Sequence, residues 1–128
     1  MDARRSKKAE TLRTRALITR RARSFFDAHG FEEIHVPTMV RSPGLEPHLD
    51  AFEVVTDHPA RYLHTSPEFA LKKVLGLGLQ RVYNLGPCFR DEPHSSTHSP
   101  QFTMLEWYVT GFDLFELMKQ TEAFIHSL

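Results

Sequence analysis

The sequence predicts an α+β fold in which an antiparallel β-sheet is flanked by helices. Apolar residues recur at helical spacing near both ends of the chain, and the second half holds two extended segments joined by a polar loop, which is typical of a β-hairpin. A chain of 128 residues, with 41% hydrophobic and 25% charged residues, is about one globular domain and is long enough to bury a core.

The first predicted helix runs from Leu12 to about His29. Its small and apolar residues recur every three or four positions: Leu12, Ala16, Thr19, Ala22 and Phe26. Gly30 follows where a left-handed cap residue is expected. Apolar and polar residues then alternate over 33–36 before Pro37, which has no N–H for a sheet ladder, so we expect a short strand that ends there.

The start of the chain is strongly basic, although the formal net charge is zero. Residues 1–23 hold nine Lys or Arg and two acidic residues. Charge runs usually mark a solvated face, so residues 1–11 are read as a basic lead, with an RNA-binding or acidic-partner surface as the alternative. No apolar run approaches the ~18 residues of a membrane-spanning helix. The single cysteine fits a reducing, cytoplasmic setting.

Prolines and glycines divide the middle of the chain. Those within residues 41–50 predict a loop, and the segments Phe52–Val55 and Tyr62–Thr65 on either side of another turn predict short strands. Extended segments are then expected at Val82–Glu92 and Gln101–Val109. The polar stretch between them is too long for a tight turn, so it predicts an antiparallel hairpin with a surface loop.

Two further helices have recognisable ends. Ser66 is the expected cap of a helix whose first residue is Pro67, and the glycines of residues 76–80 end that helix. Asp113 and Glu116 form a capping-box pattern at the start of the last helix. Its predicted apolar stripe consists of Leu114, Leu117, Met118, Thr121, Phe124, Ile125 and Leu128.

The predicted hairpin contains the side chains that suggest a binding site. Side chains alternate between faces along a strand, so Cys88, Arg90 and Glu92 share one side. A guanidinium binds phosphate in a two-pronged manner, and the ring of Phe102 offers a surface on which a base can stack. His98, at the far end of the loop, is placed to reach an outer phosphate. The pattern is therefore that of a nucleotide site, with a surface ion pair between Arg90 and Glu92 as the alternative.

Glu106 is the unusual residue of the second strand. Its face of the strand is otherwise apolar or aromatic: Phe102, Met104 and Tyr108. A carboxylate on a half-buried face is costly unless it is paired, so we expect Glu106 to meet a cation from the protein or from a ligand. No metal site is predicted, because His94 and His98 lie in a loop without a second pair of ligands.

Three segments resemble signatures of class II aminoacyl-tRNA synthetases, in the lysine-type version. F-R-D-E followed by H-S-P-Q-F-T-M-L-E-W-Y, within residues 89–108, resembles motif 2; H-G-F-E-E-I-H-V-P at 29–37 resembles motif 1; and T-S-P-E at 65–68 resembles a signature of the same subclass. The resemblance spans residues 12–128, as the N-terminal part of a catalytic domain without a counterpart of motif 3. T-M-L-E-W-Y and T-S-P-E look most like the paralogues that attach (R)-β-lysine to elongation factor P.

The resemblance implies an ATP site on the hairpin. Arg90 would contact the α-phosphate and the amino-acid carboxylate, and it is the candidate catalytic residue. Glu92 would bind the adenine amine, His98 the outer phosphates, and Phe102 the base. Mg²⁺ is expected for the family, with ligands that are not in this chain. Where the family usually has an arginine shortly before the histidine, this sequence has Ser96 and Thr97.

The resemblance also implies an amino-acid site. Glu68 would receive the amino group near the substrate carboxylate, while Glu106 and Tyr108 would receive the side-chain ammonium. Lysine or β-lysine would be activated as an adenylate and passed to elongation factor P, or to tRNA in a true lysyl-tRNA synthetase. Motif 1 would form a homodimer through the first helix and strand. The alternative is a truncated paralogue that binds or dimerises without catalysis.

Overall fold

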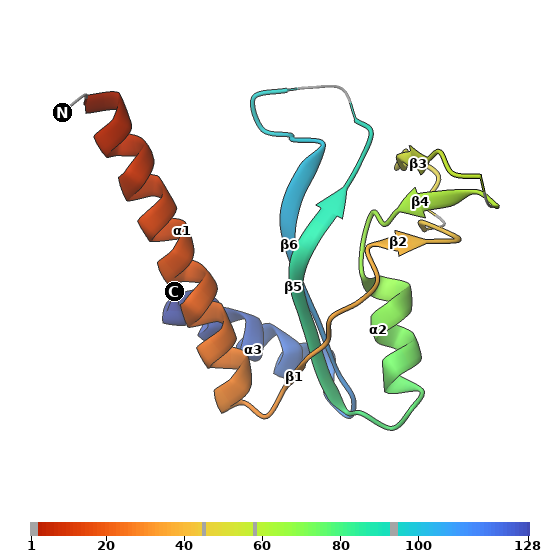
Figure 1. The fold of residues 1–128 in the computed structure, drawn as a ribbon. Helices are drawn as coiled ribbons and strands as arrows, with labels where there is room; N and C mark the ends of the chain where they lie inside the picture. Colours follow the sequence, from red (N-terminus) through yellow and green to blue (C-terminus); the bar gives the residue numbers. More distant parts are fainter. Residues whose placement is uncertain (1–2, 45, 58, 93–94) are drawn as a thin grey trace. The chain divides into compact units, whose positions relative to one another are not determined.

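A computed structural model describes residues 3–44, 46–57, 59–92 and 95–128 of the chain (Figure 1). The predicted α+β class is confirmed. The elements in chain order are α1 (Ala3–Ala28), β1 (Glu32–Glu33), β2 (Met39–Val40), β3 (Glu53–Val54), β4 (Arg61–Leu63), α2 (Glu68–Leu75), β5 (Arg81–Phe89), β6 (Gln101–Val109) and α3 (Leu114–Ser127). They form two compact units: α1 and α3 belong to one, and the strands and α2 belong to the other.

The helical unit is built around phenylalanine rings. Phe26 is fully buried, with its ring centroid 5.1 Å from that of Phe31 and 5.3 Å from that of Phe124. The chain turns after α1 at Gly30, whose φ of 72° is left-handed, so the predicted cap is confirmed. The helix itself begins at Ala3 and thus takes in most of the basic lead.

Helix α3 has the predicted start, but its apolar stripe is largely exposed. Asp113 Oδ1 accepts from the Glu116 amide at 2.8 Å, and Glu116 Oε2 accepts from the Asp113 amide at 2.8 Å, which confirms the capping box. Of the predicted stripe only Phe124 is buried, alongside Gln120. The apolar side chains of Leu114, Leu117, Met118 and Ile125 are exposed, so the predicted stripe is wider than the side of α3 that is buried within this unit.

The strand unit contains the predicted hairpin. β5 and β6 pair antiparallel from Arg81 opposite Val109 to Phe89 opposite Gln101, in the sheet order β1-β5-β6. β1 runs parallel to β5, so this sheet is mixed. The prediction of a strand over 33–36 is wrong in its extent, because β1 covers only Glu32–Glu33. The Asn84 side chain donates to the Ile34 carbonyl at 2.7 Å, so a side chain takes the place of a ladder partner where the chain leaves the sheet.

A second, small sheet has the antiparallel order β2-β4-β3. β3 and β4 lie within or next to the segments predicted as strands, but both are shorter than predicted. β2 was not predicted. It has two residues and lies between prolines, so it shows none of the alternation that marks a strand in sequence.

Helix α2 starts one residue later than predicted. Pro67 occupies the cap position with a helical φ of −77°, and Ser66 Oγ accepts from the Glu68 amide at 3.1 Å without being the cap residue. The helix ends at Leu75, before Gly78 with a φ of 98°, so the glycine terminator is confirmed. Across the described parts of the chain, the search for a helix with the length and apolarity of a membrane span finds none.

Candidate functional site

One face of the β5-β6 hairpin brings the candidate nucleotide residues together. Cys88 lies opposite Phe102 in the ladder, and the Arg90 amide donates to the Pro100 carbonyl at 3.0 Å, which extends the pairing by one residue. The Arg90 Cζ atom lies 5.1 Å from the centroid of the Phe102 ring. Arginine and ring therefore stack in a cation–π arrangement on the same side of the hairpin.

A hollow of about 190 Å³ opens at this end of the hairpin. It is lined by the four residues expected to bind ATP and by two residues of the connecting loop: Arg90, Glu92, His98 and Phe102, with Thr97 and Ser99. Arg90 and Glu92 thus lie on the same side, as the strand alternation predicted. Among the described residues the two do not form an ion pair, so both charges face the hollow.

The Arg90 guanidinium is positioned by the Phe102 ring but keeps a hydrogen-bond donor that no described residue uses. Its Nε atom is buried and has no hydrogen-bond partner among the described residues. A buried donor without an acceptor is unfavourable, and an arriving anion removes that cost. The side chain is consequently suited to a two-pronged interaction with a phosphate or a carboxylate.

His98 is positioned by the loop that precedes it. Ser95 Oγ accepts from the amides of Thr97 at 3.3 Å and His98 at 3.1 Å, and it lies 2.8 Å from His98 Nδ1. These contacts leave His98 on the rim of the hollow. His94 is outside the described residues. No group of three potential metal-ligating His, Cys, Asp or Glu side chains occurs in the part of the chain that is described.

Glu106, farther along the same face, is bonded to hydroxyls. Ser66 Oγ donates to its Oε2 at 2.7 Å, and the Tyr108 hydroxyl donates to its Oε1 at 2.7 Å. Glu106 was expected to meet a cation from the protein or from a ligand. Here each of its two oxygens instead accepts a hydrogen bond from one hydroxyl. In the sequence Ser66 is recognisable only as a helix cap, because nothing local links it to a strand residue forty positions away.

Tyr108 connects Glu106 to helix α2. Burial raises the pKa of the Tyr108 phenol well above its usual range, and the hydrogen bond to Glu106 and the charges of Glu106 and Glu68 raise it further. The phenol therefore remains protonated and remains a donor. Lys72 forms an ion pair with Glu68, and its Nζ lies 5.9 Å from the centroid of the Tyr108 ring. Lys72 was absent from the predicted site, although its spacing of four from Glu68 on a helix was a signal.

Cys88 lies on the same face of the hairpin as Arg90 and Glu106. Its Sγ is 3.8 Å from His64 Nε2 and 3.9 Å from Met104 Sδ. Burial raises the pKa of the thiol to about 11; the charge of Glu106 adds to the rise, and the charge of Arg90 opposes it. The thiol is protonated at neutral pH, so it packs rather than acts as a nucleophile.

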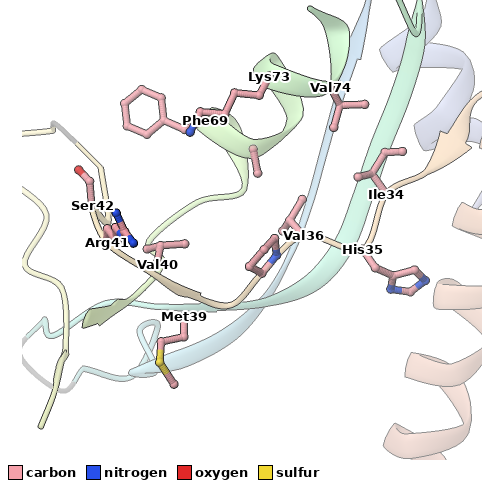
Figure 2. A pocket seen from close by; sticks show the side chains of 12 residues that line it. Ile34, His35, Val36, Met39, Val40, Arg41, Ser42, Phe69, Lys73 and Val74 are labelled. Atoms are coloured by element: carbon pink, nitrogen blue, oxygen red, sulfur yellow. The ribbon is translucent and has the colours of Figure 1, made fainter. Parts of the chain in front are cut away.

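A second, larger hollow of about 660 Å³ lies elsewhere in the strand unit (Figure 2). It is formed by the segment 34–42 and by the exposed side of α2, which contributes Phe69, Lys73 and Val74. None of the candidate site residues lines it. It is mostly apolar and none of the described acidic residues lines it, so the hairpin hollow remains the candidate nucleotide site.

The comparisons with known proteins agree with the motifs. The chain matches the family of class II tRNA synthetases (D, K and N) over residues 1–128. The chain belongs to this family. It is 39% identical over 124 residues to the elongation factor P–(R)-beta-lysine ligase of Pseudoalteromonas translucida (strain TAC 125), and 36% identical over 125 residues to the ligase of that name from Vibrio vulnificus (strain YJ016).

These matches cover 92% and 93% of this chain but only 38% and 39% of the two relatives. The protein of the same name from Vibrio cholerae is 38% identical over 120 residues, which is 37% of its length. The chain thus spans less than two fifths of the curated relatives it matches.

Proposed function

We propose that residues 12–128 form the part of a ligase's catalytic domain that binds ATP and a cationic amino acid, and that the ligase activates lysine or β-lysine and transfers it to a lysine of elongation factor P. The proposal rests on one observation above all: Arg90, Glu92, His98 and Phe102 surround one hollow, on the hairpin face that also carries Glu106. The names of the relatives support the choice of amino acid and acceptor.

At the nucleotide end, the protein would act by positioning and by charge stabilisation. ATP would lie with its base against Phe102, its amino group toward Glu92 and its outer phosphates toward His98. The substrate carboxylate oxygen forms a bond to the α-phosphorus while the bond to the oxygen of the leaving pyrophosphate breaks. Arg90 would stabilise the charge that builds on the α-phosphate oxygens during this step.

At the amino-acid end, the side chains select a cation. Glu106, aligned by the Ser66 and Tyr108 hydroxyls, would accept the side-chain ammonium, and Glu68 would accept the amino group near the carboxylate. The acceptor amine then attacks the acyl carbon, AMP leaves, and the amine loses its proton to solvent. Mg²⁺ is expected for such ligases, but the described residues offer no cluster of ligands that fits it, so the steps above rest on side chains alone.

We also propose that two copies associate through the first helix and the segment that follows it. Of these two elements, the segment after the helix lines the larger hollow of Figure 2, an apolar groove in which Met39 is 51% exposed and Phe69 of α2 is 41% exposed. Exposed apolar grooves of this kind are typical of protein interfaces.

A cytoplasmic location is proposed because the single cysteine is buried and free.

Sedimentation tests the dimer. Met39→Glu should raise the dimer dissociation constant about ten-fold or more, because a two-fold interface carries the substitution twice. Val55→Glu is the matched control, since Val55 follows β3, is 96% exposed and does not line the groove. A wild-type chain that sediments as a monomer at all concentrations, or equal weakening by both variants, rejects the interface.

ATP–pyrophosphate exchange tests the main proposal. It is measured with lysine and with β-lysine, on this chain alone and on this chain joined to the C-terminal part of a relative. Arg90→Ala should lower amino-acid-dependent exchange about 100-fold or more, as for the loss of a transition-state donor. Arg61→Ala is the control, because the Arg61 side chain donates to the carbonyls of Pro59 and Ala60 and does not line the hairpin hollow.

Each result of this assay has a definite meaning. Exchange by the joined protein but not by the chain alone supports an activity shared with the remainder of the catalytic domain. No exchange by either form, or full exchange by the Arg90 variant, contradicts the proposal and leaves the non-catalytic binding module.

A further inference from the structure

We propose that Lys72 is a resident counter-cation of the amino-acid site: its ammonium group occupies the space between Glu68 and Tyr108 until the amino group of an incoming amino acid displaces it. The inference rests on the proposed function and goes one step further, since it assigns a role to a residue outside the expected site. It makes Lys72 a residue that tunes affinity and specificity rather than a catalytic one.

The first support is the position of the ammonium. Lys72 Nζ is paired with a carboxylate oxygen of Glu68 and lies 5.9 Å from the centroid of the Tyr108 ring. An ordinary surface pair on a helix involves that helix alone, whereas this ammonium also faces an aromatic ring of strand β6. It therefore stands where a carboxylate of one element and a π-face of another converge, which is a favourable place for any ammonium group.

The second support is the balance of charge. Both Glu68 and Glu106 lie close enough to Tyr108 for their charges to raise the pKa of its phenol. Glu106 has two hydroxyl donors, so its oxygens are satisfied without a cation. Glu68 has the Lys72 ammonium as its side-chain partner, and the amino group of a bound substrate would require that same carboxylate.

The third support is that the pair can open without disturbing the fold. The side chains of Lys72 and Glu68 are 53% and 35% exposed, so the ammonium can move into water by rotating about its own side-chain bonds. Partly exposed pairs of this kind are weak, and displacing one lowers the affinity of a ligand by no more than about five-fold. Lys72 can thus yield to a substrate while covering Glu68 in its absence.

The inference makes a distinction between ligands. L-lysine brings an amino group next to its carboxylate and must displace Lys72. 6-Aminohexanoate keeps the carboxylate and the side-chain ammonium but lacks that amino group, so it leaves the pair between Lys72 and Glu68 intact. A role of Lys72 in folding alone would affect both ligands equally.

Calorimetric titration of the chain with these two ligands is the test. Lys72→Gln should bind L-lysine about two- to five-fold more tightly than wild type, while its affinity for 6-aminohexanoate stays unchanged. Lys119→Gln, the same change at an exposed lysine of α3, should alter neither affinity.

The outcomes separate the two proposals. Equal or weaker binding of L-lysine by Lys72→Gln overturns the inference while the proposed function stands. Tighter binding of both ligands by the same factor also overturns it, because the effect then does not depend on the amino group. Binding of L-lysine to none of the three proteins overturns the inference together with the amino-acid site of the proposed function.

Discussion

The polar groups at the two ends of the hairpin face are satisfied in opposite ways. At the proposed nucleotide end, Arg90 and Glu92 face an open hollow and, among the described residues, form no ion pair with each other, and the Arg90 Nε atom has no acceptor there. At the amino-acid end, Glu106 already accepts from two hydroxyls and Glu68 already holds a cation. The first end therefore has a buried donor without an acceptor among the described residues, whereas the carboxylates of the second end have partners from the protein itself.

The difference follows from where the partners come from. The nucleotide end is built from one hairpin, so the strand ladder alone fixes Arg90 beside Phe102. The amino-acid end joins β6 to the start of α2 through the bond from Ser66 to Glu106. An anion would therefore meet an Arg90 Nε donor that has no acceptor among the described residues, whereas an amino group that binds Glu68 would displace Lys72, so selectivity at that end would depend on this displacement.

The largest effect on ligand affinity is expected from Glu106→Gln. The amide keeps the shape of the side chain but removes the negative charge and turns one acceptor into a donor that faces a hydroxyl. Removing one partner of a desolvated charge pair costs about 2 kcal/mol or more, so the affinity for lysine should fall at least about 30-fold. ATP affinity should be unchanged, because the nucleotide end does not share these contacts.

Titration of each ligand separately checks this prediction. Glu122→Gln is the control, since Glu122 is an exposed residue of α3 in the other unit. A matching loss of ATP affinity in the Glu106 variant would mean that the two ends of the hairpin face are not independent.

The parts of this arrangement that the sequence predicts are local ones. The strand over Gln101–Val109, the Asp113 capping box and the turn at Gly30 each depend on residues within a few positions of one another, and all are present. Contacts of Glu106 with Ser66 and of Lys72 with Tyr108 join residues 40 and 36 positions apart. No periodicity encodes such pairs, because they depend on how α2 is placed against the sheet.

A middle-sized effect is expected from Phe102→Leu at the nucleotide end. Leucine keeps an apolar side chain but removes the ring on which the base would stack, and it also releases Arg90 from its cation–π contact. Base stacking on an aromatic ring is worth about 1–3 kcal/mol, so ATP affinity should fall about ten-fold. Equilibrium binding of ATP measures this, and unchanged binding would place the base elsewhere.

The smallest effect is expected at Cys88, which responds to both ends. Burial raises the pKa of its thiol from 9.0 to about 11, so the protonated thiol is favoured in the fold. Stability that depends on this protonation is complete below pH 9 and is lost as the pH rises through about 11. Cys88→Ala should remove that part of the alkaline loss, as measured by urea unfolding at pH 8 and pH 11.

The same thiol can report the sign of the charge at each end, because Glu106 raises its pKa and Arg90 lowers it. Glu106→Gln should therefore lower the pKa of Cys88, and Arg90→Gln should raise it. The chain has a single cysteine, so a ¹³Cβ-labelled sample gives one NMR signal to follow against pH. Shifts in the same direction for both variants would mean that the thiol senses a change in burial. Opposite shifts would mean that one carboxylate and one guanidinium act on Cys88 from the two ends of a single face, as a substrate with an ammonium at one end and a carboxylate at the other requires.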